Sequence, residues 1–411
     1  MKKFLILTAA AVAVFASCAK TIDHTRNTGQ GDALSFGVYV PQTKAGAAGQ
    51  TTTTSIQRAE GDGGGFGVFA YYTNDGDYSA SAKPNFMYNQ GVFYSSPKWT
   101  YDPVKYWPNE YGSGANSTGT DKLSFFAYAP YVATASGPYG ITTFTPAKNG
   151  TGDPTITYVI DPTPSKAVDL CWAVKSDTGK PWLDQTKQTV DGTVNFLFKH
   201  ALARFNVNVR GFFDAVRASD GQISTDDIDS KTKITIEKIE IKGTFAPSGT
   251  LNLNNTTADK ALWTPATAAV TTLTIPRTDI AESLRATENG ETSFPGASVT
   301  GVTKTNVNVF TGAAPTKADA TYYTFIPTEN DITLNVKITY YVTTQDAKLD
   351  GEISCVKNVI DKDITFTGGF ACGLNYNLNI VLGMTTVKLE ATVEDWADPT
   401  RLVIDLPVNL S

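Results

Sequence analysis

A single cysteine lies directly behind an apolar leader, and its position predicts covalent lipid attachment. Lys2 and Lys3 are followed by an almost wholly apolar run at 4–15, then by two small residues and Cys18. Such a run is too short to cross a bilayer but fits the core of a signal peptide. The pattern is typical of a bacterial lipoprotein signal, in which the chain is cut before the cysteine and the thiol is diacylated. Phe15 departs from the leucine usual at its position, and ordinary secretion with cleavage nearby is the alternative.

The other residues that commonly do chemistry form no catalytic motif. The chain has only 2 histidines, and it lacks a Gly-x-Ser-x-Gly motif, a phosphate-binding loop and a His/Glu metal pair. His24 follows the lipidation site, and His200 in "FKHALARF" is expected to be a packed or capping residue. We therefore predict no enzymatic activity, no cofactor and no metal site. Glycoside hydrolysis by two distant carboxylates is the enzymatic alternative.

Three cysteines remain once Cys18 carries lipid, namely Cys171, Cys355 and Cys372. Their odd number and their spacing argue against a disulfide framework and against a metal site. Buried thiols are predicted, with one Cys355–Cys372 bridge as the alternative. The net charge of -6, without a basic stripe, argues against a nucleic-acid partner.

Alternation of apolar and polar residues predicts an all-β protein. In 332–340, Ile332, Leu334 and Val336 begin a face that is apolar at every second residue, and Thr333 begins the polar face. This pattern is typical of an antiparallel strand with one buried face. Similar segments recur along the chain with turn residues between them, whereas helical periodicity is scarce. Many short strands of this kind predict β-sandwiches.

The length predicts two domains behind the leader, because a single core rarely serves so long a chain. We expect a signal peptide at 1–17, a lipidated tether at 18–32, an N-terminal domain at 33–195 and a C-terminal domain at 196–411. Residues 41–65 are rich in Gly, Ala, Thr and Gln, which predicts an exposed and mobile loop.

Several stretches, taken in order, resemble the fimbrillin (Mfa-like) family of pilus subunits. They are "FMYNQGVFYSSPKWTYDPVKYWP" (86–108), "LSFFAYAP" (123–130), "FLFKHALARFNVNV" (196–209) and "GLNYNLNIVL" with "VEDW" (373–382 and 393–396). The resemblance implies two tandem transthyretin-like β-sandwich domains of Greek-key type and no enzymatic activity. It also implies export as an outer membrane lipoprotein and a later role in adhesion as part of a type V pilus, or fimbrium.

The resemblance further implies assembly by donor-strand exchange. Family members are held inactive by their first strand until an arginine-specific protease cuts behind it, and a neighbouring subunit then supplies the replacement. In this chain the segment at 33–40 matches that first strand, with four apolar residues on one face: Leu34, Phe36, Val38 and Val40. The bond between Arg58 and Ala59 is the preferred cleavage bond, and Lys44 and Arg26 are poorer alternatives.

The C-terminal tail at 397–411 is the predicted donor strand. Apolar residues occupy every second position of it: Leu402, Ile404, Leu406, Val408 and Leu410. Pro407 cannot donate a ladder hydrogen bond, which suits a sheet edge or an inserted strand. A permanent last strand of the C-terminal domain is the alternative interpretation. The partners implied are other pilin subunits, the processing protease and, before processing, the outer membrane.

Two other classes of function stay open at this point, a surface glycan-binding lipoprotein and a non-polymerising pilus anchor or tip adhesin. The first would need an exposed aromatic platform, for which the candidates are Trp99, Tyr101, Tyr106 and Trp107. The other interpretation of these residues is a corner that packs on the N-terminal domain, since aromatic side chains bury large areas.

Overall fold

The computed structural model describes residues 33–40, 50–108, 121–212, 215–217, 223–228, 232–255, 257, 261–274, 283–285, 322–345, 353–383, 387–395 and 402–405. Nearly all regular elements in these ranges are strands, which confirms the predicted all-β class, while the transthyretin-like topology stays a prediction. The helices are single turns: α1 (Thr53–Ile56), α2 (Lys187–Val190) and the 3-10 helices η1 (Glu60–Asp62) and η2 (Pro164–Lys166). None of the helices in the described ranges is long and apolar enough to cross a membrane.

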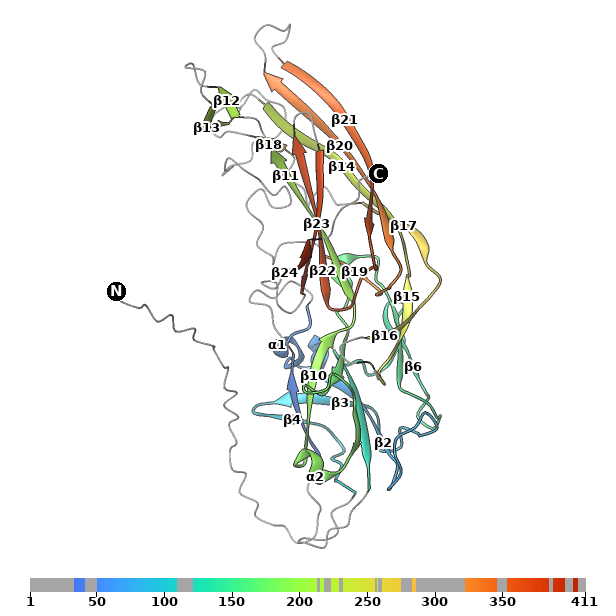
Figure 1. Cartoon of the computed structure of the whole chain (residues 1–411). Coiled ribbons are helices and arrows are strands. Elements are labelled where there is room, and N and C mark those ends of the chain that lie inside the picture. The colour runs from blue at the N-terminus through green and yellow to red at the C-terminus, as the bar shows by residue number, and fades with distance from the viewer. Residues whose placement is uncertain are drawn as a thin grey trace, which may run out of the picture.

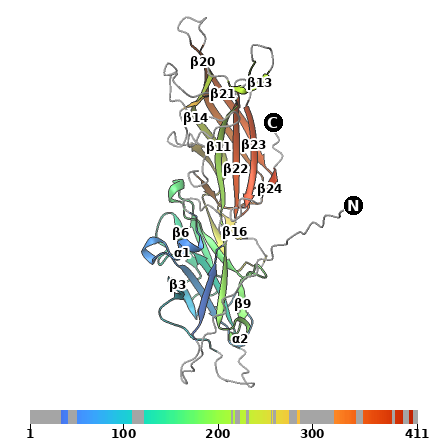
Figure 2. The same ribbon diagram turned by 90° about the vertical axis from the view of Figure 1, so that its left-hand side faces the viewer.

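The strands form two β units that lie end to end and give the molecule an elongated shape (Figures 1 and 2). The N-terminal unit contains an 8-stranded and a 4-stranded sheet, and the C-terminal unit contains two 5-stranded sheets. A short pair, β12 (Ala215–Arg217) and β13 (Ile223–Ile228), forms a separate 2-stranded sheet.

The sheets of the N-terminal unit draw on distant parts of the chain. In order across the larger sheet, the strands are β1 (Ser35–Tyr39), β10 (Thr193–His200), β8 (Cys171–Val174), β5 (Leu123–Ala129), β2 (Phe66–Tyr72), β3 (Met87–Ser95) and β4 (Lys98–Thr100), with β9 (Trp182–Gln185) paired to β5. The smaller sheet has the order β16 (Leu262–Pro265), β15 (Ser248–Asn252), β7 (Thr155–Val159) and β6 (Gly140–Thr145).

The central strands β2 and β5 of the larger sheet are buried on both faces, which explains their nearly continuous apolar sequences. One face packs on the smaller sheet and forms the inner core, which includes Phe69, Tyr71, Phe126, Tyr128 and Trp172 together with Ile156, Tyr158 and Leu251. The other face forms a second cluster, here called the barrel core, which includes Leu34, Phe36, Phe66, Phe125, Phe196 and Phe198.

The larger sheet curls around the barrel core until its two edges approach each other. β1 and β4 stand at opposite ends of the strand order, yet the two strands are in contact. An isolated bridge between Ala33 and Tyr106 adds a second connection near the same place. β1 is therefore the edge strand that brings the larger sheet close to a closed barrel.

The C-terminal unit is a sandwich of two sheets around one core. The first sheet has the order β19 (Tyr323–Phe325), β11 (Ala203–Phe212), β22 (Leu374–Gly383), β23 (Val387–Asp395) and β24 (Leu402–Asp405). The second has the order β17 (Ala269–Thr274), β14 (Thr232–Phe245), β20 (Ile332–Gln345) and β21 (Ile353–Phe366), with β18 (Ser283–Arg285) paired to β14. The alternation predicted for 332–340 is present, because Ile332, Leu334, Val336, Ile338 and Tyr340 all lie in the core.

Within the described residues, the chain passes between the two units three times. It leaves the N-terminal unit after β10, returns after β14 to form β15 and β16, and leaves again into β17. The division predicted between residues 195 and 196 falls inside β10, and β15 pairs with β7 of the N-terminal unit. At the junction, Trp263 Nε1 donates a hydrogen bond of 2.6 Å to the carbonyl of Ala201.

Leu251 links a late segment of the chain to the inner core, where its side chain is fully buried. We expect Leu251→Ala to lower the free energy of unfolding by about 2–5 kcal/mol, because it removes buried methyl groups and leaves a cavity. Urea unfolding followed by tryptophan fluorescence measures this loss. Val270→Ala is the control, since Val270 is 63% exposed. Equal, small losses in both variants would contradict the placement of β15 in the inner core.

Candidate functional site

Strand β1 is an edge strand with a single ladder partner. It pairs in parallel with β10, in a register that sets Phe36 opposite Val194 and Val38 opposite Phe196. The alternation predicted for 33–40 directs its apolar face inward. Leu34, Phe36 and Val40 are 2%, 5% and 0% exposed, and Val38 is partly buried against the same core. Tyr39, on the opposite face, is 57% exposed.

Phe36 lies among four aromatic rings that come from four other parts of the N-terminal unit. Its ring stacks on Phe196 at a centroid distance of 5.6 Å. It meets the edges of Phe66 and Phe125 at 6.1 and 6.2 Å, and Tyr101 at 5.5 Å. Burial of one phenylalanine stabilises a fold by about 1.5–3 kcal/mol, and favourable ring pairs add to this. Phe36 is thus the main apolar contact between β1 and the rest of the unit.

Hydrogen bonds fix the start of β1 against the segment that follows β4. The Leu34 N–H donates to the carbonyl of Lys105 at 2.9 Å, and the Tyr101 hydroxyl donates to the carbonyl of Leu34 at 2.7 Å. Burial raises the pKa of Tyr101 to about 12, so the phenol keeps its proton and remains a donor at neutral pH. The chain is therefore held at Leu34, directly before the first residue of β1, by a backbone and a side-chain hydrogen bond together.

The predicted aromatic corner at 99–107 packs inward on this part of the unit. Trp99 contacts Phe66 with ring centroids 5.1 Å apart. Trp107 is 3% exposed, and its Nε1 donates to the carbonyl of Gly192 at 3.1 Å. Tyr106 is the most exposed of the set at 36%. These residues support β1 and the barrel core rather than forming a flat outer platform.

The bond between Arg58 and Ala59 lies in a compact turn. Both residues are exposed, and they directly follow α1 and precede η1. A capping box between Thr52 and Ser55 starts α1, whose last residue, Ile56, is fully buried in the barrel core. The expectation of a mobile loop over 41–65 is therefore wrong for residues 50–65, which are built into the N-terminal unit.

The glycines at 63–65 close this turn tightly rather than making it flexible. The carbonyl of Ala59 accepts hydrogen bonds from the N–H groups of Asp62 and Gly64, at 3.0 and 3.1 Å. A Cβ at Gly64 would lie 1.9 Å from the carbonyl oxygen of Arg58, which leaves room only for glycine. Composition alone suggested mobility here, but the glycines are needed for the close approach of two backbone segments.

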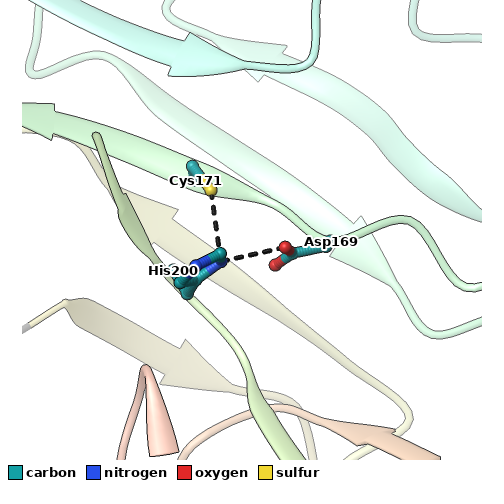
Figure 3. A group of neighbouring side chains, drawn as sticks. All are labelled: Asp169, Cys171 and His200. Carbon is teal, nitrogen blue, oxygen red and sulfur yellow. Dashed lines mark hydrogen bonds and ion pairs between the residues drawn. The ribbon is translucent and has the colours of Figure 1, made fainter. Parts of the chain in front are cut away.

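A cluster of buried polar side chains lies beside α1, at the junction end of β10 (Figure 3). Asp169 Oδ2 is 2.9 Å from His200 Nδ1, and Cys171 Sγ is 3.6 Å from the same nitrogen. Asp169 and His200 are each 3% exposed, and Cys171 is fully buried. Thr51 contacts Asp169 through its backbone N–H and its hydroxyl. The sequence did not predict this grouping, because its members come from residues 51, 169, 171 and 200.

The geometry of the cluster does not match a catalytic triad. A triad places the nucleophile and the carboxylate on different ring nitrogens, whereas both Cys171 and Asp169 face His200 Nδ1. Burial raises the pKa of the Cys171 thiol well above its usual range, so the reactive thiolate is disfavoured.

The same three side chains offer one metal-ligand atom each, and these atoms lie within 4.8 Å of one another. The buried guanidinium of Arg204, however, already places a positive charge near Asp169 and Cys171. A divalent cation would add a second buried positive charge next to it, at a high cost in desolvation. The arrangement is better suited to hydrogen bonding, with the Thr51 N–H and His200 Nδ1 both facing the carboxylate of Asp169.

The C-terminal tail contributes the other edge strand of interest. Among the strands that the structure describes, β24 pairs with β23 alone, in antiparallel fashion, with Ile404 opposite Val393 and Leu402 opposite Glu394. Several residues of the predicted processing and assembly sites lie outside the described residues: Cys18, Arg26, Lys44, Leu406, Val408 and Leu410. The side chain of Cys355 also lies outside them, so the alternative of a Cys355–Cys372 bridge is not tested; of the thiols predicted to be buried, Cys171 is buried and Cys372 is only partly so.

Comparison with known proteins identifies the family. A model of the fimbrillin-like family matches residues 51–396, and the chain therefore belongs to this family. The fimbrium subunit Fim1C of Phocaeicola vulgatus is 25% identical over 409 residues, which cover 96% of each chain. The crystal structure of a fimbrial protein from Bacteroides vulgatus shares the fold, with a TM-score of 0.57, 22% identity and coverage of 89% of this chain and 99% of that chain. The resemblance noted in the sequence is thereby confirmed.

Replacing Phe36 tests the contribution of β1 to stability. We expect Phe36→Ala to lower the free energy of unfolding by about 3–5 kcal/mol, because a fully enclosed aromatic ring is lost. Tyr39→Ala, on the exposed face of the same strand, is expected to change it by less than about 0.5 kcal/mol. Chemical denaturation of both variants measures the difference, and a small loss in Phe36→Ala would show that β1 is not packed as described.

Replacing Gly64 tests whether the turn protects the bond after Arg58. Gly64→Ala forces the turn open, so an arginine-specific protease is expected to cut at Arg58 several-fold faster than in the unchanged protein. Gly61→Ala is the matched control, because a Cβ at Gly61 meets nothing within 4 Å. Intact-mass spectrometry of timed digests gives both rates. Identical rates for the two variants would contradict a protective turn.

Proposed function

We propose that this protein is a structural subunit of a surface fimbrium that assembles by exchange of an edge strand. The observation that carries the proposal is the position of β1, which closes the barrel core yet has only one ladder neighbour. Removal of β1 would leave the hydrogen-bonding edge of β10 open and uncover the aromatic rings around Phe36. An open edge beside an apolar groove is the kind of surface that accepts a strand from another chain.

Processing at the bond between Arg58 and Ala59 would separate β1 from the rest of the chain. All residues from 33 to 58 precede that bond, and both flanking residues are exposed. An arginine-specific protease is the enzyme class that fits it. We further propose that Cys18 carries lipid and holds the precursor at the outer membrane, from which the cut would release it.

The C-terminal tail is the proposed replacement strand. β24 occupies a sheet edge and has a single neighbour, so a small number of backbone bonds keeps it on its own unit. The alternating apolar residues of 402–410 resemble the alternation of 34–40, and both segments therefore suit the same groove. Other copies of this chain, or related subunits, are the partners that this mechanism requires.

The fimbrial assignment is favoured over a glycan-binding lipoprotein by the aromatic corner. A sugar platform needs exposed rings, but Trp107 is buried and Trp99 packs between Phe66 and Tyr94. The relative named as a fimbrium subunit, which matches nearly the whole chain, supports the same choice.

Substitution of Arg58 tests the proposed function. We expect cells that express the Arg58→Ala variant to display uncut, lipidated monomer and no polymer. Cells that express the unchanged protein are expected to yield fibres whose subunits begin at Ala59. N-terminal sequencing of surface fibres and gel electrophoresis without boiling provide the two readouts. A variant lacking residues 402–411 is expected to be cut but not to polymerise. Normal fibres from Arg58→Ala would contradict the proposed cleavage bond.

A further inference from the structure

Thr51 joins the N-terminal segment to the body of the protein by two hydrogen bonds to a single residue. Its backbone N–H donates to Asp169 Oδ2 at 2.7 Å, and its hydroxyl donates to the backbone carbonyl of Asp169 at 2.6 Å. Thr51 is 5% exposed, so both bonds are shielded from water. These contacts lie seven positions before Arg58 and are separate from the pairing of β1 with β10.

Asp169 is a buried carboxylate that depends on such donors. Its Oδ2 faces the Thr51 N–H and His200 Nδ1, while its Oδ1 is buried without a hydrogen-bond partner (Figure 3). A buried charged group is destabilising unless it is paired and hydrogen-bonded. The nearby Arg204 guanidinium offsets part of the charge, but loss of Thr51 would still remove one of the two donors at Oδ2. The pocket formed by Asp169 and His200 thus favours the state in which Thr51 occupies it.

The surroundings of the pocket adapt it to an uncharged peptide. Cys171 closes one side as a neutral thiol, because burial raises its pKa. Gln50 adds a contact of 3.5 Å between its Nε2 and His200 Nε2. The pocket therefore fits a residue that offers a backbone N–H and an adjacent side-chain hydroxyl as donors, which is the pair that threonine and serine present.

Neighbouring contacts extend the attachment on both sides of Thr51. The Thr53 hydroxyl bonds both the N–H and the carbonyl of Val40, at 3.1 Å each, which ties the end of β1 to the start of α1. Ile56 then inserts into the barrel core. A cut after Arg58 breaks none of these contacts, so it leaves the segment 33–58 attached without a covalent bond.

We propose that Asp169 and His200 form a binding pocket for Thr51, and that this pocket retains the segment 33–58 after the chain is cut. The proposal rests on the proposed function for the biological cut, but it concerns a separate event, the departure of the segment. Cleavage alone then leaves the groove filled, and Thr51 must leave Asp169, as β1 must leave the barrel core, before a new strand enters.

The test uses a cut that does not depend on the natural protease. A short recognition sequence for a sequence-specific protease is inserted between Ala59 and Glu60, which are both exposed. After cutting, size-exclusion chromatography at timed intervals measures how much of the segment still co-elutes with the body. The unchanged pocket is expected to retain the segment. Asp169→Asn and Thr51→Val are each expected to speed its loss about tenfold or more, the effect of one buried hydrogen bond.

Thr54→Val is the matched control, because Thr54 is an exposed threonine three residues further along the same leaving segment, in α1. Thr51→Val alters only the leaving segment, so the conclusion does not depend on whether Asp169→Asn folds. Melting temperatures of the uncut variants verify folding. Equal release from Thr51→Val and Thr54→Val, or immediate release from the unchanged protein, would overturn the proposal. Polymer formation by the cut protein that has lost the segment 33–58 is measured separately. Failure to polymerise would contradict the proposed function, whereas the release rates test only the pocket.

Discussion

The packing of Phe36 against the barrel core is the contact on which the arrangement of the N-terminal unit depends. A sheet that curls until its edges meet needs one strand to complete it, and β1 does so with a single row of backbone bonds and one inward aromatic ring. Since the rings around Phe36 come from β2, β5, β10 and the segment after β4, one side chain connects most of the unit. β1 thus combines extensive apolar contact with a single ladder partner among the described strands.

Local patterns in the sequence were sufficient to predict the strands and the inward face of β1. Period-two alternation marks Leu34, Phe36 and Val40 as clearly as it marks the core face of β20, because a half-buried strand imposes that pattern on any sequence. β2 and β5 instead carry nearly continuous apolar segments. Their burial on both faces has a tertiary cause, since two different cores form on the same sheet.

Features that depend on contacts between distant residues could not be predicted in this way. Thr51 and Asp169 lie 118 positions apart, and nothing in the composition near Thr51 indicates that it is buried. The glycines after Arg58 resemble a flexible linker by composition, although Gly64 is required by a close backbone contact. Strands β15 and β16 lie late in the sequence, and only the tertiary fold shows that they complete the smaller sheet of the N-terminal unit.

The threefold passage of the chain between the two units has a mechanical consequence. A tensile force along the long axis of the molecule reaches the junction through three covalent connections, after β10, after β14 and after β16. The load on each connection is therefore only part of the total, and the units cannot be drawn apart by extending one linker. The hydrogen bond from Trp263 to Ala201 joins β16, which precedes the third connection, to the start of the first. Force is therefore carried across the junction by three chain segments in parallel.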